Sequence, residues 1–497
     1  MSERYVLLVR PANVYGVYNY PPLGLILIGT ALAEEGYKIE IMTHEDESSF
    51  ESDLVKKARG AFAVGITATT AEIQDGIRLA RALRNSFDRK LPLIWGGWHT
   101  TLFPEQMGVS MLVDYAVTGD GESSALLVAQ HILQGDDLSG MKVVRSPNCD
   151  LDKLALPRYD LLANIESYIT RPLTDKFQEY YQGALRWLPY ESSRGCPHDC
   201  AFCINVVADN RKYRCKDAQK VAMELSGLVS KYDLTHVKFI DDNFFVQVDR
   251  VRQIFEERAR LGLRFTWDAE CRVDYFRDGF VDEKLLRFLK RQGLVQLTLG
   301  VESGSVASLE RMRKGIHPEQ AENAVELCVK QDIVTRCSFI LDIPGDTRED
   351  ILETTRFINQ IRRFPKVVCG VHTYRPYPRS KLCEDLIRQG LFYQPSTLEG
   401  WENESCVRQY TDTTVERTWQ TNFRLSSRVS FYQSLESAFW LKAHQLTNPV
   451  ARLVNQIFIA LARFRNRNQI YAFPLDRGLY ILFRDYCTRR CVRHRGT

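Results

Sequence analysis

The sequence predicts an α/β protein in three parts: an N-terminal doubly wound, Rossmann-like domain, a partial (β/α)6 barrel of TIM type and a mainly helical C-terminal region. Two successive series of short apolar strands alternate with helical patterns, which is typical of parallel sheets. A length of 497 residues is long for a single domain. A composition with 44% hydrophobic and 26% charged residues is normal for a globular protein.

The first series occupies residues 4–135. Five apolar strands are expected, at Tyr5–Val9, Ile39–Met42, Ala61–Thr67, Leu91–Trp95 and Val113–Val117. Helical patterns separate them, notably over Leu23–Glu35 and Ala71–Arg84. Because ligands of such sheets bind beyond the carboxyl ends of the strands, the segments that follow the strands are candidate binding loops.

The second series begins near residue 190 and ends near residue 378. Strands are expected at Tyr190–Ser193, Val237–Ile240, Phe265–Ala269, Val295–Val301, Ser338–Leu341 and Val367–Tyr374, with helices at 217–232, 249–261, 282–291, 318–331 and 347–363. Six βα repeats favour an open or partial barrel, with its site at the carboxyl ends of the strands. Between the two series the pattern weakens. We therefore expect a first domain at 1–140, a connector at 141–186, the barrel domain at 187–382 and a C-terminal region at 383–497.

Composition argues against several classes of protein. No basic segment leads into an apolar stretch with a cleavage site, and no run of about 18 uncharged apolar residues occurs, so neither a secretory signal nor a transmembrane helix is expected. The 13 cysteines are an odd number spread over a long chain, which favours free thiols in a reducing compartment over a disulfide framework. A cytoplasmic location is expected.

The C-terminal region is basic. Residues 441–497 carry eleven Lys and Arg against two Asp, a net charge of +9 that leaves −5 for the rest of the chain. Over Pro449–Phe464, apolar residues recur at helical spacing: Val450, Leu453, Val454, Ile457, Phe458, Leu461 and Phe464. A core-facing helix beside a solvated basic face is favoured, and weak peripheral contact with a membrane is the alternative. The aromatic residues Trp401, Trp419, Tyr432 and Trp440 are expected in the core or over the barrel mouth.

Three cysteines stand apart by their spacing. Cys196, Cys200 and Cys203 form a C-x3-C-x2-C motif just after a predicted strand. Three thiolates on one tight loop can hold an iron-sulfur cubane and leave one iron without a protein ligand. The alternatives are three unrelated buried cysteines or a zinc site completed by His198. Zinc is disfavoured because no second pair of ligands follows at a suitable distance.

With this motif the chain resembles the radical S-adenosylmethionine (SAM) superfamily, over roughly residues 187–380. Phe202 resembles the aromatic residue that lies near the SAM adenine in that family. Glu302 and Ser303, in the segment Gly300–Ser305 at the end of the fourth barrel strand, resemble its ribose and methionyl contacts. Ile343, in Ile340–Thr347, resembles the fifth-strand residue that flanks adenine. The resemblance implies a [4Fe-4S] cluster on the three cysteines and SAM at the open iron.

The chain also departs from the family pattern. Asp241, Asp242 and Asn243 stand where a glycine-rich segment receives the SAM amino group, and Asp342 stands where glycine is common. The family's Gly-Thr after the sixth strand is here Arg379-Ser380. Arg272, at the end of the third strand, can offer a bidentate fork to the SAM carboxylate, with a structural ion pair as an equally weighted alternative.

The N-terminal sheet resembles the cobalamin-binding domain that is fused to one branch of radical SAM enzymes. The resemblance lies in Pro21–Gly24, Ile66–Thr70, Gly96–Thr101 with Pro104-Glu105, and Gly119–Glu122. It implies cobalamin contacts from Leu23, Thr67, Thr69, Gly96, Gly97, Trp98, His99, Gly119 and Gly121. Glycines at strand ends let the backbone approach a large ring closely. An Asp-x-His-x-x-Gly loop is absent, so no histidine ligand to cobalt is expected. His99 is the only alternative at a strand end, and its tight Gly-Gly-Trp-His turn favours orienting a loop or contacting the corrin over binding cobalt. A dinucleotide site is disfavoured, because Arg10–Asn13 replaces the Gly-x-Gly-x-x-Gly motif.

Together these resemblances imply an enzyme that uses a [4Fe-4S] cluster, SAM and cobalamin. The favoured activity is methyl transfer from SAM through methylcobalamin to an unactivated carbon of a small molecule, in secondary metabolism or in specialised lipid or cofactor synthesis. Oxidative cyclisation or ring rearrangement without methylation is the alternative, and a cobalamin sensor with an inactive barrel is disfavoured by the intact cysteines. The expected partners are a small-molecule substrate and an external electron donor of flavodoxin or ferredoxin type, with no nucleic acid.

Overall fold

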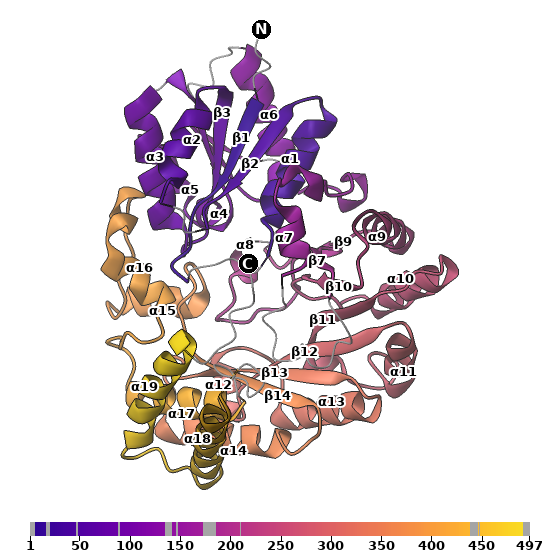
Figure 1. Cartoon of the computed structure of the whole chain (residues 1–497), viewed down its shortest axis with the longest axis vertical. Helices are drawn as coiled ribbons and strands as arrows, with labels where there is room; N and C mark the ends of the chain where they lie inside the picture. Colours follow the sequence, from indigo (N-terminus) through magenta and orange to yellow (C-terminus); the bar gives the residue numbers. More distant parts are fainter. Residues whose placement is uncertain are drawn as a thin grey trace.

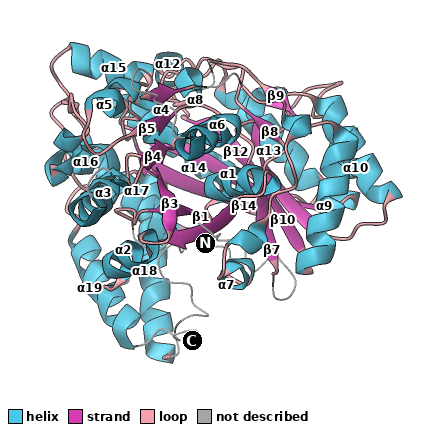
Figure 2. Cartoon of the chain, turned by 90° about the horizontal axis from the view of Figure 1, so that it is seen from above, coloured by secondary structure: helices cyan, strands magenta, loops and turns pink. Residues whose placement is uncertain are grey.

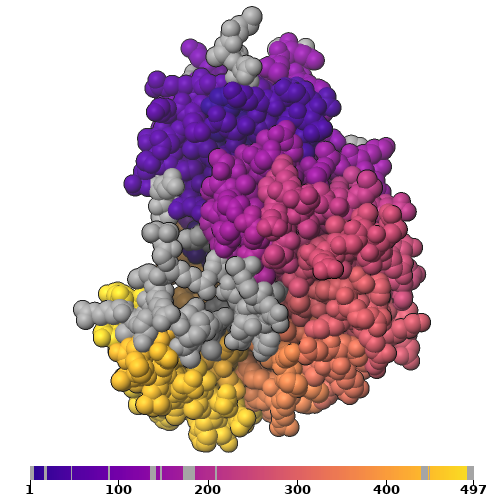
Figure 3. Space-filling model, turned by 45° about the vertical axis from the view of Figure 1, so that its right-hand side comes forward, coloured from indigo at the N-terminus to yellow at the C-terminus, as the bar shows by residue number. Residues whose placement is uncertain are grey.

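A computed structural model describes residues 5–15, 20–45, 48–87, 90–134, 142–145, 148–171, 185–208, 210–437, 446 and 448–490. The N-terminal sheet and its helices form one end of the molecule (Figure 1). The barrel strands fan out below that sheet, and the C-terminal helices lie beside the last of these strands. Figure 3 shows the same three regions as successive parts of the surface, from indigo through pink to yellow.

The N-terminal sheet has six parallel strands in the order β2-β1-β3-β4-β5-β6. They span Tyr5–Arg10 (β1), Lys38–Thr43 (β2), Ala61–Thr67 (β3), Leu93–Gly96 (β4), Tyr115–Val117 (β5) and Val143–Val144 (β6). The helices are α1 (Leu23–Glu34), α2 (Phe50–Ala58), α3 (Ile73–Phe87), α4 (Trp98–Leu102), α5 (Pro104–Val109) and α6 (Gly121–Gln134). Five strands match the prediction. The sixth is only two residues long, too short to show a period in the sequence, and it carries the sheet past residue 140.

The second sheet also has six parallel strands, in the order β14-β13-β12-β11-β10-β7. They span Trp187–Tyr190 (β7), His236–Phe239 (β10), Thr266–Arg272 (β11), Leu294–Glu302 (β12), Val334–Leu341 (β13) and Val367–Thr373 (β14). The crossing helices are α9 (Ala218–Tyr232), α10 (Val248–Arg260), α11 (Glu283–Arg291), α12 (Val306–Arg311), α13 (Pro318–Lys330) and α14 (Arg348–Ile361). The partial (β/α)6 barrel is confirmed. Figure 2 shows its strands crossing the molecule among their helices.

The first barrel strand was placed three residues too late by the sequence pattern. The expected strand at Tyr190–Ser193 is instead β7 at Trp187–Tyr190, where all four residues are buried. Ser193–Arg194 forms a separate short strand, β8, that pairs antiparallel with β9 at Arg214–Cys215. Pro189 lacks an N–H donor, and its place in β7 is tolerated because β7 lies at the edge of the sheet.

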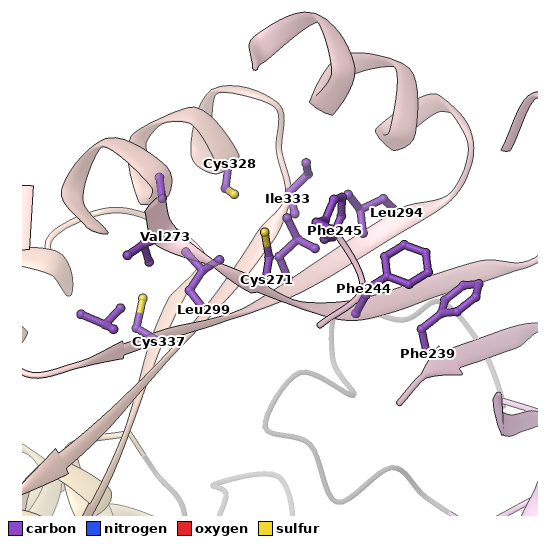
Figure 4. Packing of buried hydrophobic residues seen from close by; sticks show 14 of the residues in the cluster. Phe239, Phe244, Phe245, Cys271, Val273, Leu294, Leu299, Cys328, Ile333 and Cys337 are labelled. Atoms are coloured by element: carbon purple, nitrogen blue, oxygen red, sulfur yellow. The ribbon is translucent and has the colours of Figure 1, made fainter. Parts of the chain in front are cut away.

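The barrel core is packed with aromatic and aliphatic side chains (Figure 4). Three cysteines, Cys271, Cys328 and Cys337, lie within it and point among these apolar groups. Burial raises the pKa of the Cys328 thiol to about 12 and holds those of Cys271 and Cys337 well above their usual value. These thiols are therefore packing groups with little thiolate character.

The C-terminal region is mainly helical, as predicted. Its helices are α15 (Lys381–Arg388), α16 (Glu404–Thr411), α17 (Phe423–Glu436), α18 (Pro449–Asn468) and α19 (Leu475–Arg490). Helix α17 lies along the edge strand β14, where the Ser430 hydroxyl donates to the Val371 carbonyl over 2.9 Å. Trp401, Trp419 and Tyr432 are buried in the core, and Trp440 lies outside the described residues.

One expectation for this region was wrong for most of its residues. Five of the seven apolar residues of the stripe on α18 are exposed, namely Val450, Leu453, Ile457, Leu461 and Phe464, whereas Phe458 is half-buried and packs against the barrel core. The helix instead buries its opposite face, which carries the small and polar residues Ala451, Asn455, Ala462 and Asn466. Helical periodicity identifies an apolar face but does not say what packs against it.

The three regions share their hydrophobic cores. Ile26 of α1 and Tyr159 of the connector belong to the barrel core. A second cluster joins Trp95 of β4, Ala201 of the cysteine loop and Trp401 of the C-terminal region. The N-terminal sheet is thus fixed against the barrel by buried apolar contacts, which position the loops of the two sheets relative to each other.

Candidate functional site

The cysteine loop runs from β8 to the short helix α8 (Asn205–Ala208). Its backbone is held on both sides, because the Ala201 N–H donates to the Met312 carbonyl over 2.8 Å and the Leu382 N–H donates to the Ala201 carbonyl over 2.9 Å. Cys200 is buried, while Cys196 and Cys203 are half-buried. Burial, together with the neighbouring Cys200 and Cys196 sulfurs, raises the pKa of Cys203 to about 12. The loop therefore brings three thiols close together, one of them buried and two half-buried.

The segment Asp241-Asp242-Asn243, which follows β10, is hydrogen-bonded to this loop. The Asp241 carboxylate accepts from the backbone N–H (3.3 Å) and the hydroxyl (2.7 Å) of Ser192. The Asp242 carboxylate accepts from the Gly195 N–H (2.8 Å), where Gly195 has a φ of 81°. Both carboxylates are thus occupied in shaping the turn that precedes Cys196.

Asn243 has an open acceptor beside the first cysteine. Its Nδ2 lies 3.5 Å from the Cys196 Sγ and donates to the Tyr275 hydroxyl over 2.9 Å. Its Oδ1 is buried and has no hydrogen-bond partner among the described residues. An unpaired buried acceptor is costly, so this atom is poised for a donor such as an ammonium or hydroxyl group.

Arg272 reaches the same loop from the end of β11. Its Nη1 lies 3.6 Å from the Cys200 Sγ, its Nη2 donates to the Lys314 carbonyl (2.7 Å) and its Nε pairs with Asp274 (2.9 Å). All three nitrogens are engaged. The structure places Arg272 in the ion pair that was weighed as the alternative to a carboxylate clamp.

Glu302 and Phe202 are brought together by a residue that sequence reasoning missed, Lys314. The Lys314 Nζ pairs with Glu302 over 2.8 Å and lies 5.8 Å from the centroid of the Phe202 ring. A Cβ at Gly300 would lie 2.8 Å from that Nζ and 2.7 Å from the Glu302 carboxylate, so a side chain there would displace the pair. Lys314 follows α12 with no motif around it, and no sequence signal marked it.

Two other residues predicted to contact SAM, Ser303 and Ile343, make contacts within the protein. The Ser303 hydroxyl is turned toward α14, 2.7 Å from the Thr354 hydroxyl, and the structure does not aim it at the cysteine loop. Ile343 is buried in the cluster that includes Ala201 and Met312. Ile343 therefore lies in the apolar wall beneath the loop, whereas Ser303 joins strand to helix.

The predicted cobalamin residues gather at the carboxyl edge of the first sheet. They follow the neighbouring strands β3 (Thr67, Thr69), β4 (Gly96, Gly97, Trp98, His99) and β5 (Gly119, Gly121), and Leu23 begins α1. Gly97 has a φ of 88°, and a Cβ there would lie 2.6 Å from the Thr67 hydroxyl oxygen. At Gly121 it would lie 2.8 Å from Ile28. Gly97 also allows the chain to approach the Ala68 backbone, whose carbonyl oxygen would lie 2.9 Å from a Cβ, whereas Gly121 makes room for the Ile28 side chain.

Two family models match separate parts of the chain. Residues 190–358 match the radical SAM superfamily, and residues 11–129 match the B12 binding domain. The chain combines a radical SAM domain with a B12 binding domain. The matched stretches contain the cysteine loop and the carboxyl edge of the first sheet.

Two curated relatives match about three quarters of this chain. An uncharacterised methyltransferase of Pyrococcus horikoshii is 29% identical over 79% of this chain and 85% of its own. The anaerobic magnesium-protoporphyrin IX monomethyl ester cyclase of Rubrivivax gelatinosus is 26% identical over 74% of this chain, which spans 66% of that relative. The structure of the radical SAM methyltransferase TsrM from Kitasatospora setae superposes with a TM-score of 0.64, at 18% identity, over 95% of this chain and 100% of that one.

The residues present in this radical SAM enzyme fit the cofactors of the family. Three clustered thiols match the ligand set of a [4Fe-4S] cluster with one iron left to SAM. Asn243 Oδ1 offers an unpaired acceptor next to them, and the Glu302–Lys314 pair lies against Phe202. The glycine-lined edge of the first sheet suits a broad ring.

His99 is enclosed in this radical SAM enzyme. Its ring is fully buried between Phe103 (4.8 Å) and Trp401 (4.9 Å), and its Nδ1 lies 3.3 Å from the Thr70 hydroxyl. Burial lowers the His99 pKa to about 3, so the imidazole stays neutral at physiological pH. Trp401, which covers it, carried no motif, and its indole N–H donates to Gln106 over 2.9 Å.

The two domains of the enzyme meet through charge as well as apolar contact. Arg194, two residues before Cys196, donates to Asp120 in the β5–α6 loop (3.1 Å) and to Glu122 in the first turn of α6 (2.6 Å). Helix α4 lies against α8. Burial alone would raise the Asp120 pKa, but the Arg214 hydrogen bond and the Arg194 charge lower it to about 2. The candidate cobalamin loop is thereby tied to the cysteine loop.

Proposed function

We propose that this enzyme transfers a methyl group from SAM, by way of cobalamin, to an unactivated carbon of a small molecule. The observation that carries the proposal is the direct junction of the two loops. The glycine loop after β5 is ion-paired to Arg194, and the segment after β4 lies against the helix that follows Cys203. The methyltransferase named among the relatives supports this reading.

Each group of residues has a proposed task. Cys196, Cys200 and Cys203 hold the cluster, Asn243 accepts a hydrogen bond from the SAM amino group, and Glu302 with Lys314 positions the methionyl or ribose end. The carboxyl edge of the first sheet holds cobalamin without a histidine ligand. When bound, these cofactors supply one-electron cleavage of SAM and a carrier for a methyl group. The buried walls exclude water, and an external protein of flavodoxin or ferredoxin type supplies the electron.

A second function is favoured by one specific observation, the 26% identity to an anaerobic cyclase of the same family. Cyclisation would use the same cluster and SAM site but would leave the product without an added methyl group. The residues described at the site are compatible with either outcome, so the products must decide.

The deciding experiment uses SAM with a deuterated methyl group. Anaerobic incubation with reductant and candidate substrates should give a product that carries the labelled methyl, together with both S-adenosylhomocysteine and 5′-deoxyadenosine. Mass spectrometry measures all three. Formation of 5′-deoxyadenosine and an unlabelled product without S-adenosylhomocysteine would overturn methyl transfer in favour of cyclisation.

A further inference from the structure

The outer face of α18 is an exposed apolar stripe. Val450, Leu453, Ile457, Leu461 and Phe464 are between 41% and 67% exposed, and they recur every three or four residues along one side of the helix. On the opposite side, the helix packs on α17, and Asn466 Nδ2 donates to the Tyr432 carbonyl over 3.1 Å. The stripe is therefore the solvent-exposed face of a helix whose other side is packed on α17.

Helix α19 continues this surface. Leu475, Leu479, Leu482 and Tyr486 form a second stripe, 54% to 81% exposed, and Phe473 in the preceding turn is 85% exposed. The two helices are fixed to each other. The Phe458 ring contacts Tyr480 (5.3 Å) and Phe483 (5.7 Å), and Arg465 pairs with Asp476 over 2.8 Å. Below, "the hairpin" means residues 449–490.

Basic side chains border the apolar stripes. The hairpin carries eight Arg and two Asp, a net charge of +6. Arg452, Arg463 and Arg467 of α18 are exposed. Within the described residues, no helix combines the length and apolar character needed to cross a bilayer. An apolar face bordered by arginines, without a spanning helix, is the pattern of a segment that lies in a membrane interface.

Charge decides between the two occupants that an apolar surface of this kind admits. A second copy of the chain would bring two hairpins of charge +6 against each other, which disfavours a symmetric contact. An anionic lipid surface satisfies both features, since it takes up the apolar side chains and attracts the arginines. We propose that the hairpin docks this enzyme on the surface of a membrane that contains anionic phospholipid.

The test is cosedimentation of the full-length enzyme with vesicles. One set contains equal amounts of phosphatidylglycerol and phosphatidylcholine, and the other contains phosphatidylcholine alone. We expect the enzyme to bind the anionic vesicles about ten-fold more strongly than the neutral ones at low salt. This binding should weaken when the salt is raised to about 0.15 M. Absence of binding to the anionic vesicles at low salt overturns the proposal without recourse to any variant.

Two variants separate the apolar from the electrostatic contribution. Leu453→Gln with Ile457→Gln and Leu461→Gln should lower partitioning about ten-fold. Arg452→Gln with Arg463→Gln and Arg467→Gln should reduce the preference for anionic lipid and its salt dependence. The matched control changes three exposed apolar residues elsewhere, Val109→Gln, Leu127→Gln and Met223→Gln, and should bind as the parent does.

Sedimentation equilibrium identifies the competing occupant. The enzyme should have the same mass with and without the apolar substitutions. A stable dimer that the apolar variant dissociates, combined with vesicle binding that this variant leaves unchanged, would show that the hairpin is an interface between two copies. Melting curves of the apolar and control variants should overlay that of the parent, because their substituted side chains are exposed. The arginine variant also loses the pair between Arg463 and Glu436 (3.4 Å) and should melt slightly lower.

Discussion

At the residue scale, Asn243 is the most informative polar side chain of the candidate site. It contacts Cys196 and Tyr275 through Nδ2 and keeps a buried Oδ1 unpaired. We expect Asn243→Ala to retain the cluster but to weaken SAM binding about ten-fold, the effect of one lost hydrogen bond in a buried site. Titration of the reconstituted protein with SAM measures this. Ser303→Ala is the control and should keep SAM affinity, because its hydroxyl is turned to Thr354.

His99 offers a test of how the cobalt is ligated. Its ring is enclosed by Phe103 and Trp401, and burial keeps it neutral, with a pKa of about 3. We expect His99→Ala to leave the lower-ligand signature of bound cob(II)alamin unchanged in the paramagnetic resonance spectrum. Nitrogen splitting in the parent protein that disappears in the variant would contradict this expectation.

Asp342 should make the free energy of unfolding depend on pH. Burial raises its pKa to about 6, although the Ser426 hydroxyl and Gln420 amide both donate to it. The folded protein therefore holds this proton more tightly than the unfolded chain does. The resulting stabilisation is complete below about pH 4 and is lost as the pH rises through about 6.

The variant Asp342→Asn removes this titration, and asparagine tolerates the φ of 61° at this position. Relative to the parent, it should gain about 2 kcal/mol in free energy of unfolding between pH 4 and pH 7. Denaturant melts at several pH values measure the difference. Parallel pH profiles for the two proteins would show that Asp342 does not titrate in this range.

At the scale of elements, Arg194 joins the loop after β5 to the cysteine loop. Replacing it by Met would leave the buried Glu122 carboxylate without its partner at 2.6 Å, at a cost of roughly 3 kcal/mol. We expect Arg194→Met to lower the melting temperature and to loosen cobalamin. Arg313→Met removes an exposed pair with Asp199 and serves as control. Equal stability of the two variants would refute a role for Arg194 at the junction.

The helices and strands also show which parts of the fold could be predicted from the sequence. Apolar periodicity located most strands within three residues, because buried parallel strands are continuous apolar runs. It could not place β6, which is two residues long, or foresee that α18 would bury Ala451 and Ala462 and expose its leucines. Motif spacing located the cysteine loop. Motif spacing could not show that Asp241 and Asp242 hydrogen-bond to this loop. It also could not show that Lys314 pairs with Glu302. Both depend on tertiary contacts that leave no local pattern in the sequence.

At the scale of the whole molecule, one buried cluster unites the first sheet, the cysteine loop and the C-terminal region through Trp95, Ala201 and Trp401. The C-terminal region therefore supports both candidate cofactor sites, since Trp401 covers His99 and Leu382 bonds to Ala201. The enzyme should therefore have two separable cofactor sites, one for the cluster in the barrel and one for cobalamin on the first sheet.

The measurement that tests this requirement most directly is the paramagnetic resonance spectrum of the reconstituted, reduced protein in which Cys196, Cys200 and Cys203 are all changed to Ala. The account predicts that the [4Fe-4S] signal and SAM cleavage are lost while bound cobalamin remains, and that Cys215→Ala, a neighbouring half-buried thiol, changes neither. A triple variant that keeps the cluster signal and still cleaves SAM would contradict it.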